Sequence, residues 1–75
     1  MEEKITFQTV AGDTVSLPAK DFLYTKKGGD NPAVRVLVFY TGNAPDGGFL
    51  NTPYTVKAED ADRILNNIRK IIFNQ

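Results

Sequence analysis

The chain has 75 residues, with nine Lys and Arg, nine Asp and Glu, and no His, Cys or Trp. This length allows a single domain over residues 1–75. The absence of Cys and His excludes disulfides, the usual zinc and iron ligand sets, and catalysis by Cys–His or Ser–His–Asp groups. A net charge of zero, balanced within residues 1–57 and within residues 58–75, is not typical of a protein that coats nucleic acid.

Five segments alternate apolar and polar side chains in the manner of β-strands. In the first segment Ile5 and Phe7 point to one face, and the turn around Gly12 that follows is typical of a hairpin. Two Gly-containing loops separate the later segments. The predicted strands are residues 4–10, a segment with Val15 and Leu17 that ends at Pro18, residues 21–27, residues 33–41 and residues 52–57, with loops at residues 26–32 and 42–50.

The strand at residues 33–41 is apolar on both faces. Val36 and Val38 lie on one face, and Leu37 and Phe39 lie on the other. Such a strand is expected to be central and covered on both sides. One helix can cover one face, so the face with Leu37 and Phe39 needs a second cover. Either the sheet curls over its own core, or a second copy packs there, with Leu37 and Phe39 at the interface. We expect the second arrangement, a homo-oligomer.

Residues 58 to about 73 predict an amphipathic helix. Its acids lie in the first turns, and Arg69 and Lys70 lie near its end, which complements the helix dipole. The elements together predict an α+β domain, in which an antiparallel meander sheet of four to five strands is followed by one C-terminal amphipathic helix. The apolar face of the helix contains Ala61, Ile64, Leu65, Ile68, Ile71 and Ile72.

Arg35 interrupts the apolar pattern of the central strand. A buried Arg needs a carboxylate, a phosphate or a partner chain beside it. Three arrangements are therefore open for this side chain: it pairs with a local acid such as Asp30, it reaches solvent at the rim of the sheet, or it contacts an anion on the sheet surface.

The two Gly loops carry the other candidate contacts. Lys26 and Lys27 precede a Gly pair that begins at Gly28, an arrangement that can hold a phosphate and is also typical of a solvated hairpin tip. Phe49 lies in a polar loop with no obvious core to join, and Tyr54 could stack on a base. The candidate ligand-binding residues are thus Lys26, Lys27, Arg35, Phe49 and Tyr54.

The carboxylates favour a structural role over a catalytic one. Asp13, Asp30 and Asp46 lie in predicted turns, where Asp bonds to the local backbone. Glu59 and Asp60 lie in the first turn of the helix, where acids stabilise the helix end. No Gly-rich stretch matches a P-loop or a dinucleotide-binding motif, and the second Gly loop lacks EF-hand spacing. We therefore expect no enzyme activity, no cofactor and no metal.

Three stretches define the layout of the chain: a strand at Ile5-Thr6-Phe7, a turn at Gly12-Asp13, and Tyr-Thr-Val-Lys-Ala-Glu at residues 54–59, where the helix begins with acidic residues. This layout resembles that of the FlbD-like family of small flagellar proteins. The resemblance spans most of the chain and implies a β-meander with a C-terminal helix and no catalytic residues. Residues 48–54 and the helix also look like the ending of the dimeric single-strand DNA binders of the positive-cofactor type.

The sequence predicts a small cytoplasmic domain that acts by binding. Residues 1–4 are polar and unlike a signal peptide, and no apolar run is long enough to span a bilayer. The first hypothesis is a homo-oligomeric protein, such as a phage or bacterial accessory protein, that binds or sequesters a small anionic ligand such as a nucleotide signal between its subunits. The alternatives are a protein–protein adaptor or assembly regulator, and a single-stranded nucleic-acid-binding protein.

Overall fold

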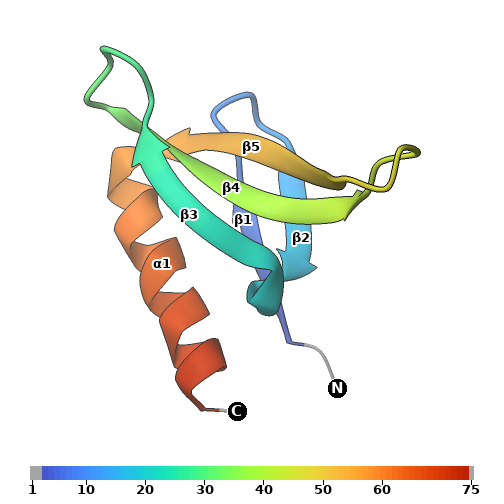
Figure 1. Cartoon of the computed structure of the whole chain (residues 1–75). Helices are drawn as coiled ribbons and strands as arrows, with labels where there is room; N and C mark the ends of the chain where they lie inside the picture. Colours follow the sequence, from blue (N-terminus) through green and yellow to red (C-terminus); the bar gives the residue numbers. More distant parts are fainter. Residues whose placement is uncertain (1–2, 75) are drawn as a thin grey trace.

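The computed structural model describes residues 3–74, which form five β-strands, a short 3₁₀ turn and one α-helix (Figure 1). All strand pairs are antiparallel, so the α+β prediction is confirmed. The elements in chain order are β1 (Lys4–Gln8), β2 (Thr14–Pro18), η1 (Ala19–Asp21), β3 (Phe22–Lys27), β4 (Val34–Asn43), β5 (Phe49–Lys57) and α1 (Ala58–Phe73).

The strands form two sheets, and the prediction of one meander sheet was wrong on this point. β1 pairs with β2, and β3, β4 and β5 form a separate sheet in that order. The break falls at Pro18, which cannot donate a backbone hydrogen bond, and at the 3₁₀ turn that follows it. The backbone N–H of Val10 donates to Thr55 O at 2.9 Å, which fixes the end of the β1–β2 hairpin against β5.

The β4–β5 hairpin is longer than the sequence predicted. Its strands run to Asn43 and from Phe49, so only residues 44–48 remain as the turn, in place of a loop over residues 42–50. A register shift between Tyr40 and Gly42, whose φ is 139°, allows the pairing to continue past the predicted end. Apolar alternation stops before this point, which is why the sequence pattern ended the strand early.

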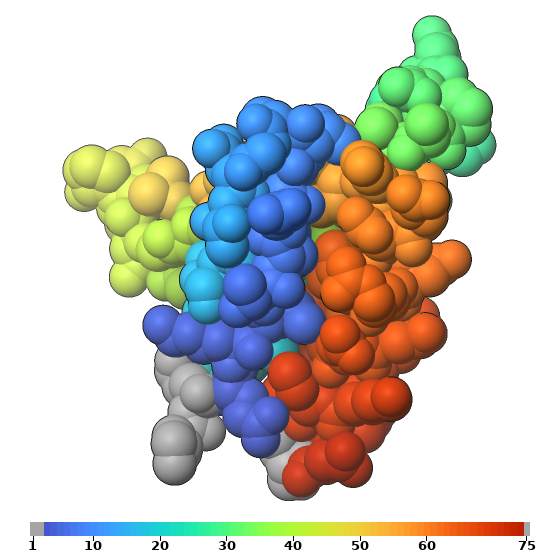
Figure 2. Space-filling model, turned by 180° about the vertical axis from the view of Figure 1, so that it is seen from behind, coloured from blue at the N-terminus to red at the C-terminus, as the bar shows by residue number. Residues whose placement is uncertain are grey.

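The core lies on the inner face of β4. Leu37 and Phe39 are fully buried there, between the three-stranded sheet, the β1–β2 hairpin and α1. Seen from behind, the hairpin and the helix lie side by side over this face (Figure 2). Leu37 and Phe39 are therefore not available as an interface, and the expectation that they contact a second copy is corrected. The sheet and the hairpin close over them within one chain.

The helix α1 follows its prediction closely, running from Ala58 to Phe73. Ala61, Ile64 and Ile68 are its buried side chains, and they contact the same core as Phe39. No helix in residues 3–74 is long and apolar enough to cross a membrane.

The outer face of β4 is not covered by any other element of residues 3–74 (Figure 1). Val36 and Val38 point to this face, because they alternate with Leu37 and Phe39. They are only 9% and 3% exposed, since side chains of the neighbouring strands flank them. Tyr24 and Pro53 lie on either side of Val38 in the strand register. The apolar side chains on both faces of β4 are therefore buried within one chain, and the second cover expected from the sequence is not needed.

The variant Leu37→Ala tests the position of the core. It is expected to lower the free energy of unfolding by about 2–5 kcal/mol, because it leaves a cavity among well-packed side chains. Leu50→Ala is the matched control, because the Leu50 side chain is 46% exposed; its expected effect is below about 0.5 kcal/mol. Urea denaturation followed by circular dichroism measures both, and equal losses in the two variants would contradict this assignment.

Candidate functional site

The loop between β3 and β4 folds back on the start of β4. The Asn31 side chain accepts a hydrogen bond from the backbone N–H of Ala33 at 2.9 Å, a local turn typical of Asn. Gly28 lies so close to Val34 that a Cβ at this position would meet Val34 Cγ2 at 2.5 Å. Residue 28 must therefore be glycine, or Val34 must move, for the loop to pack in this way.

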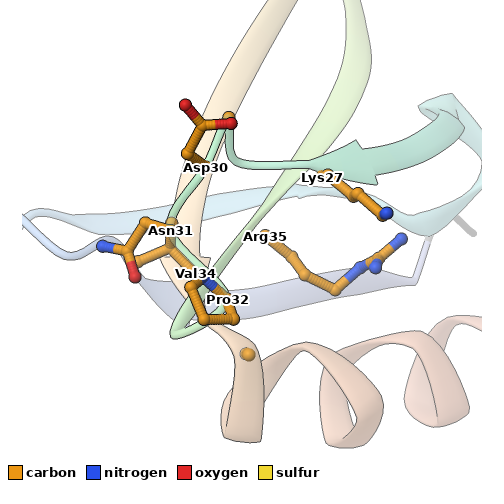
Figure 3. A pocket seen from close by; sticks show the side chains of 8 residues that line it. Lys27, Asp30, Asn31, Pro32, Val34 and Arg35 are labelled. Atoms are coloured by element: carbon orange, nitrogen blue, oxygen red, sulfur yellow. The ribbon is translucent and has the colours of Figure 1, made fainter.

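A cavity of about 470 Å³ lies between this loop and the first residue of α1 (Figure 3). The backbone N–H of Ala58 donates to Ala33 O at 2.8 Å, which joins the start of the helix to the end of the loop. The lining residues are Lys27, Gly29, Asp30, Asn31, Pro32, Val34, Arg35 and Ala58.

Two cations in this lining come from opposite positions on neighbouring strands. Lys27 of β3 and Arg35 of β4 are register partners, and their side chains extend side by side in the same direction above α1 (Figure 3). Arg35 is half-buried, and its Nε donates to Thr25 Oγ1 at 3.3 Å. Thr25 in turn donates to Val36 O at 2.9 Å, so the strand holds the guanidinium in place through one hydroxyl.

Neither Lys27 nor Arg35 has a carboxylate partner within residues 3–74. An ion pair is found elsewhere, on α1, where Arg63 and Asp60 lie 3.6 Å apart. Asp30 points away from Arg35 (Figure 3), so the pairing of these two residues that the sequence left open is not formed. Like charges placed directly opposite each other in a sheet repel and destabilise the pairing. An anion bound between Lys27 and Arg35 would remove that repulsion, so this pair is the strongest candidate for a binding site.

The structure does not bring the five candidate residues together. Lys26 lies opposite Val36 and points to the outer face of the sheet, away from Lys27. Phe49 is 77% exposed at the far end of the β4–β5 hairpin, where its ring meets that of Tyr40 edge-on at 5.8 Å. Tyr54 is half-buried and packs against the core, with its ring centroid 5.9 Å from that of Phe7. Of these five residues, Lys27 and Arg35 line one cavity together in the part of the chain that the structure describes.

Part of this separation of the five candidate residues follows from the sequence alone. Consecutive residues in a strand point to opposite faces, so Lys26 and Lys27 could not both face one ligand. The same alternation places Thr25 on the face of Lys27, and the register with β4 then brings it beside Arg35. Sequence reasoning missed Thr25 as the residue that orients the guanidinium. No sequence pattern indicates that Ala58 and the loop around Asn31 lie close together, because this contact depends on how α1 returns to β4.

No known protein family, curated protein or solved structure was found to match this chain. No group of three or more carboxylates within residues 3–74 is arranged to hold a metal ion. The geometry and charge of the Lys27–Arg35 cavity are therefore the observations from which a function can be argued.

The variant Lys27→Glu tests the repulsion between the two cations. It is expected to raise stability by about 0.5–1 kcal/mol at low salt, because it replaces a like-charge cross-strand pair with an opposite-charge pair. Lys26→Glu makes the same charge change on the other face and is expected to give no such gain. Thermal melts at low and high ionic strength measure the effect, which salt should reduce. Equal gains from both variants would show that Lys27 and Arg35 do not interact.

Proposed function

We propose that this protein binds a small anionic ligand and carries out no chemistry on it. The observation that supports this function is the pair of cations, Lys27 and Arg35, which face one cavity without a carboxylate partner among the described residues. A phosphate group is the best match, because the Arg guanidinium presents a planar set of donors to phosphate oxygens and Lys adds a compact positive charge.

The rest of the cavity favours a ligand larger than a bare phosphate. A volume of about 470 Å³ is in the range of small-molecule sites. Pro32 and Val34 supply apolar surface beside the cations, and Asn31 lies at the same wall. A nucleotide, with its phosphate between Lys27 and Arg35 and its remaining part against this wall, has the required combination of charge and apolar surface.

The proposal of binding without catalysis is supported by the chemistry of the lining. Catalysis of acyl or phosphoryl transfer needs a base, a nucleophile or a pair of carboxylates at a set distance. Asp30 supplies the carboxylate of the cavity, and it points away from the two cations (Figure 3). The FlbD-like layout and the role of an adaptor or assembly regulator stay predictions, with no feature of the cavity that favours them.

A thermal-shift titration with pyrophosphate and with mono-, di- and cyclic nucleotides at low salt tests the proposal. The wild-type chain is expected to melt at a higher temperature, since a ligand at a hundredfold excess over its Kd adds about 2.7 kcal/mol to stability. Lys27→Ala and Arg35→Ala are expected to abolish the shift. Lys26→Ala, which removes the adjacent Lys from the opposite face, is the control and should keep it. The proposal fails if no anion shifts the melting temperature, or if Lys26→Ala has the same effect as Lys27→Ala.

Single-stranded nucleic acid is a second candidate ligand, favoured by the outer face of the three-stranded sheet. This face lies open and carries Tyr24, which is 49% exposed, and Tyr40 with the ring of Phe49 against it. Lys26 points to the same face. Aromatic side chains beside cations on an open sheet can stack on bases. The neutral net charge of the chain weakens this candidate, because nucleic-acid binding draws on a surplus of Lys and Arg.

Fluorescence polarisation with a labelled oligothymidine at low salt separates the two candidates. If the outer face binds the oligonucleotide, Tyr24→Ala should weaken binding by about 1–3 kcal/mol, and Lys27→Ala should have little effect. Absence of binding at low salt would eliminate this second candidate and leave the Lys27–Arg35 proposal unaffected.

A further inference from the structure

A second surface of the molecule lies along the side of α1 that faces β3. A groove of about 410 Å³ runs between these two elements. Phe22 and Thr25 line it from β3, and Leu65, Arg69, Ile72 and Phe73 line it from α1. Ile72 is 40% exposed and Phe73 is 80% exposed. Single exposed apolar side chains are common, but here they continue the wall of an apolar groove, which is typical of an interaction surface.

Two charged residues lie on the same side of the helix. Asp62, Leu65, Arg69 and Ile72 follow one another at intervals of three and four residues, which places them in one stripe. The helical repeat adds Ala58 at one end of this stripe and Phe73 at the other. Within residues 3–74 neither Asp62 nor Arg69 forms an ion pair, whereas Asp60 and Arg63 pair with each other. The stripe therefore carries an unpaired acid in its first half and an unpaired base in its second half.

We propose that this stripe is the contact surface of a homodimer, in which α1 of one copy packs antiparallel against α1 of the other. A two-fold axis near Leu65 places Asp62 opposite the partner's Arg69, and the same operation places Arg69 opposite the partner's Asp62. Such a surface is complementary to itself, as the two sides of a two-fold interface must be. The antiparallel arrangement also sets the positive end of each helix dipole beside the negative end of the other.

The same register gives the exposed Phe73 a place to pack. It lies as far from the axis on one side as Ala58 lies on the other, so each Phe73 ring meets the partner's Ala58. Ala58 is part of the wall of the Lys27–Arg35 cavity, which brings each cavity next to the dimer interface. Dimerisation would also supplement a core that has no disulfide to support it, a common solution for domains of this size.

Two other free surfaces fit a second copy less well. β3 is the edge of its sheet, but Lys26 and Lys27 stand at one end of that edge, and Lys is a residue that discourages pairing between edge strands. Among residues 3–74, the outer sheet face has exposed aromatic rings but no pair of opposite charges that a two-fold axis would bring together. The α1 stripe is the surface on which shape, charge and symmetry agree.

Size-exclusion chromatography with light scattering on the full chain, over a range of concentrations up to millimolar, tests the proposal. The expected mass is twice the 8.3 kDa of one chain. Asp62→Arg and Arg69→Asp each place like charges opposite one another twice in the dimer, and each is expected to weaken association about tenfold. The double variant, which exchanges the two charges, should restore it.

Asp13→Arg makes the same charge change in the distant β1–β2 turn and serves as the control, and melting curves establish that each variant is folded. A chain that stays monomeric throughout would overturn the dimer. A dimer that neither single reversal weakens, or that the double variant does not restore, would overturn the antiparallel α1 contact. Lys27→Ala should leave the dimer intact, so this test and the anion-binding test fail independently.

Discussion

The burial of Leu37 and Phe39 is the contact on which the rest of the fold depends. A chain of 75 residues without Cys or His has no disulfides and lacks the usual zinc ligand sets, so apolar packing is its main source of stability. Three parts of the chain close over these two side chains: the β1–β2 hairpin, the turn η1 and the helix α1. The ring of Phe39 is within 5.5–6.0 Å of the rings of Phe7, Phe22 and Tyr54, which come from three different strands. These contacts set the position of β3 and β5 on either side of β4.

The candidate site follows from this packing. Because β3 must pair with β4 to cover the core, Lys27 comes to lie opposite Arg35. The pairing brings two positive charges together at the point where the loop and the start of α1 enclose a cavity. A fold selected for stability alone would place an acid at one of these positions, as the cross-strand preference for opposite charges shows. Stability is often traded for function at binding sites, and an anionic ligand is the proposed function of this pair of adjacent cations.

Much of the fold could be predicted from the sequence because it rests on local patterns. The alternation of Ile5 and Phe7, the run of residues 34–39 and the helical spacing of Ala61, Ile64 and Ile68 each define one element. What could not be predicted depends on contacts between elements. Alternation shows that β4 is apolar on both faces, but it does not show which face the hairpin and helix cover, and the wrong face was chosen. The separation into two sheets depends on where the chain turns after Pro18, a matter of tertiary packing.

The site was predictable to a similar degree. Arg35 stands out as a charge within an apolar strand, and Lys27 follows from strand alternation once the register with β4 is known. Phe49 was a reasonable candidate as an aromatic in a polar loop, yet the continuation of β4 and β5 carries it to the opposite end of the molecule. Sequence distance gave no information about that separation. Which residues line one cavity with Lys27 and Arg35 could be known only from the three-dimensional structure.

An NMR titration of the ¹⁵N-labelled chain with pyrophosphate tests whether Lys27 and Arg35 form an anion site. Amide signals of Ala58 and of the non-proline residues within 27–35 are expected to shift in a saturable manner, while those of the non-proline residues within 44–50 at the far hairpin stay in place. The absence of shifts near Lys27 and Arg35, or shifts confined to the outer face of the sheet around Tyr24 and Lys26, would contradict the anion-site proposal.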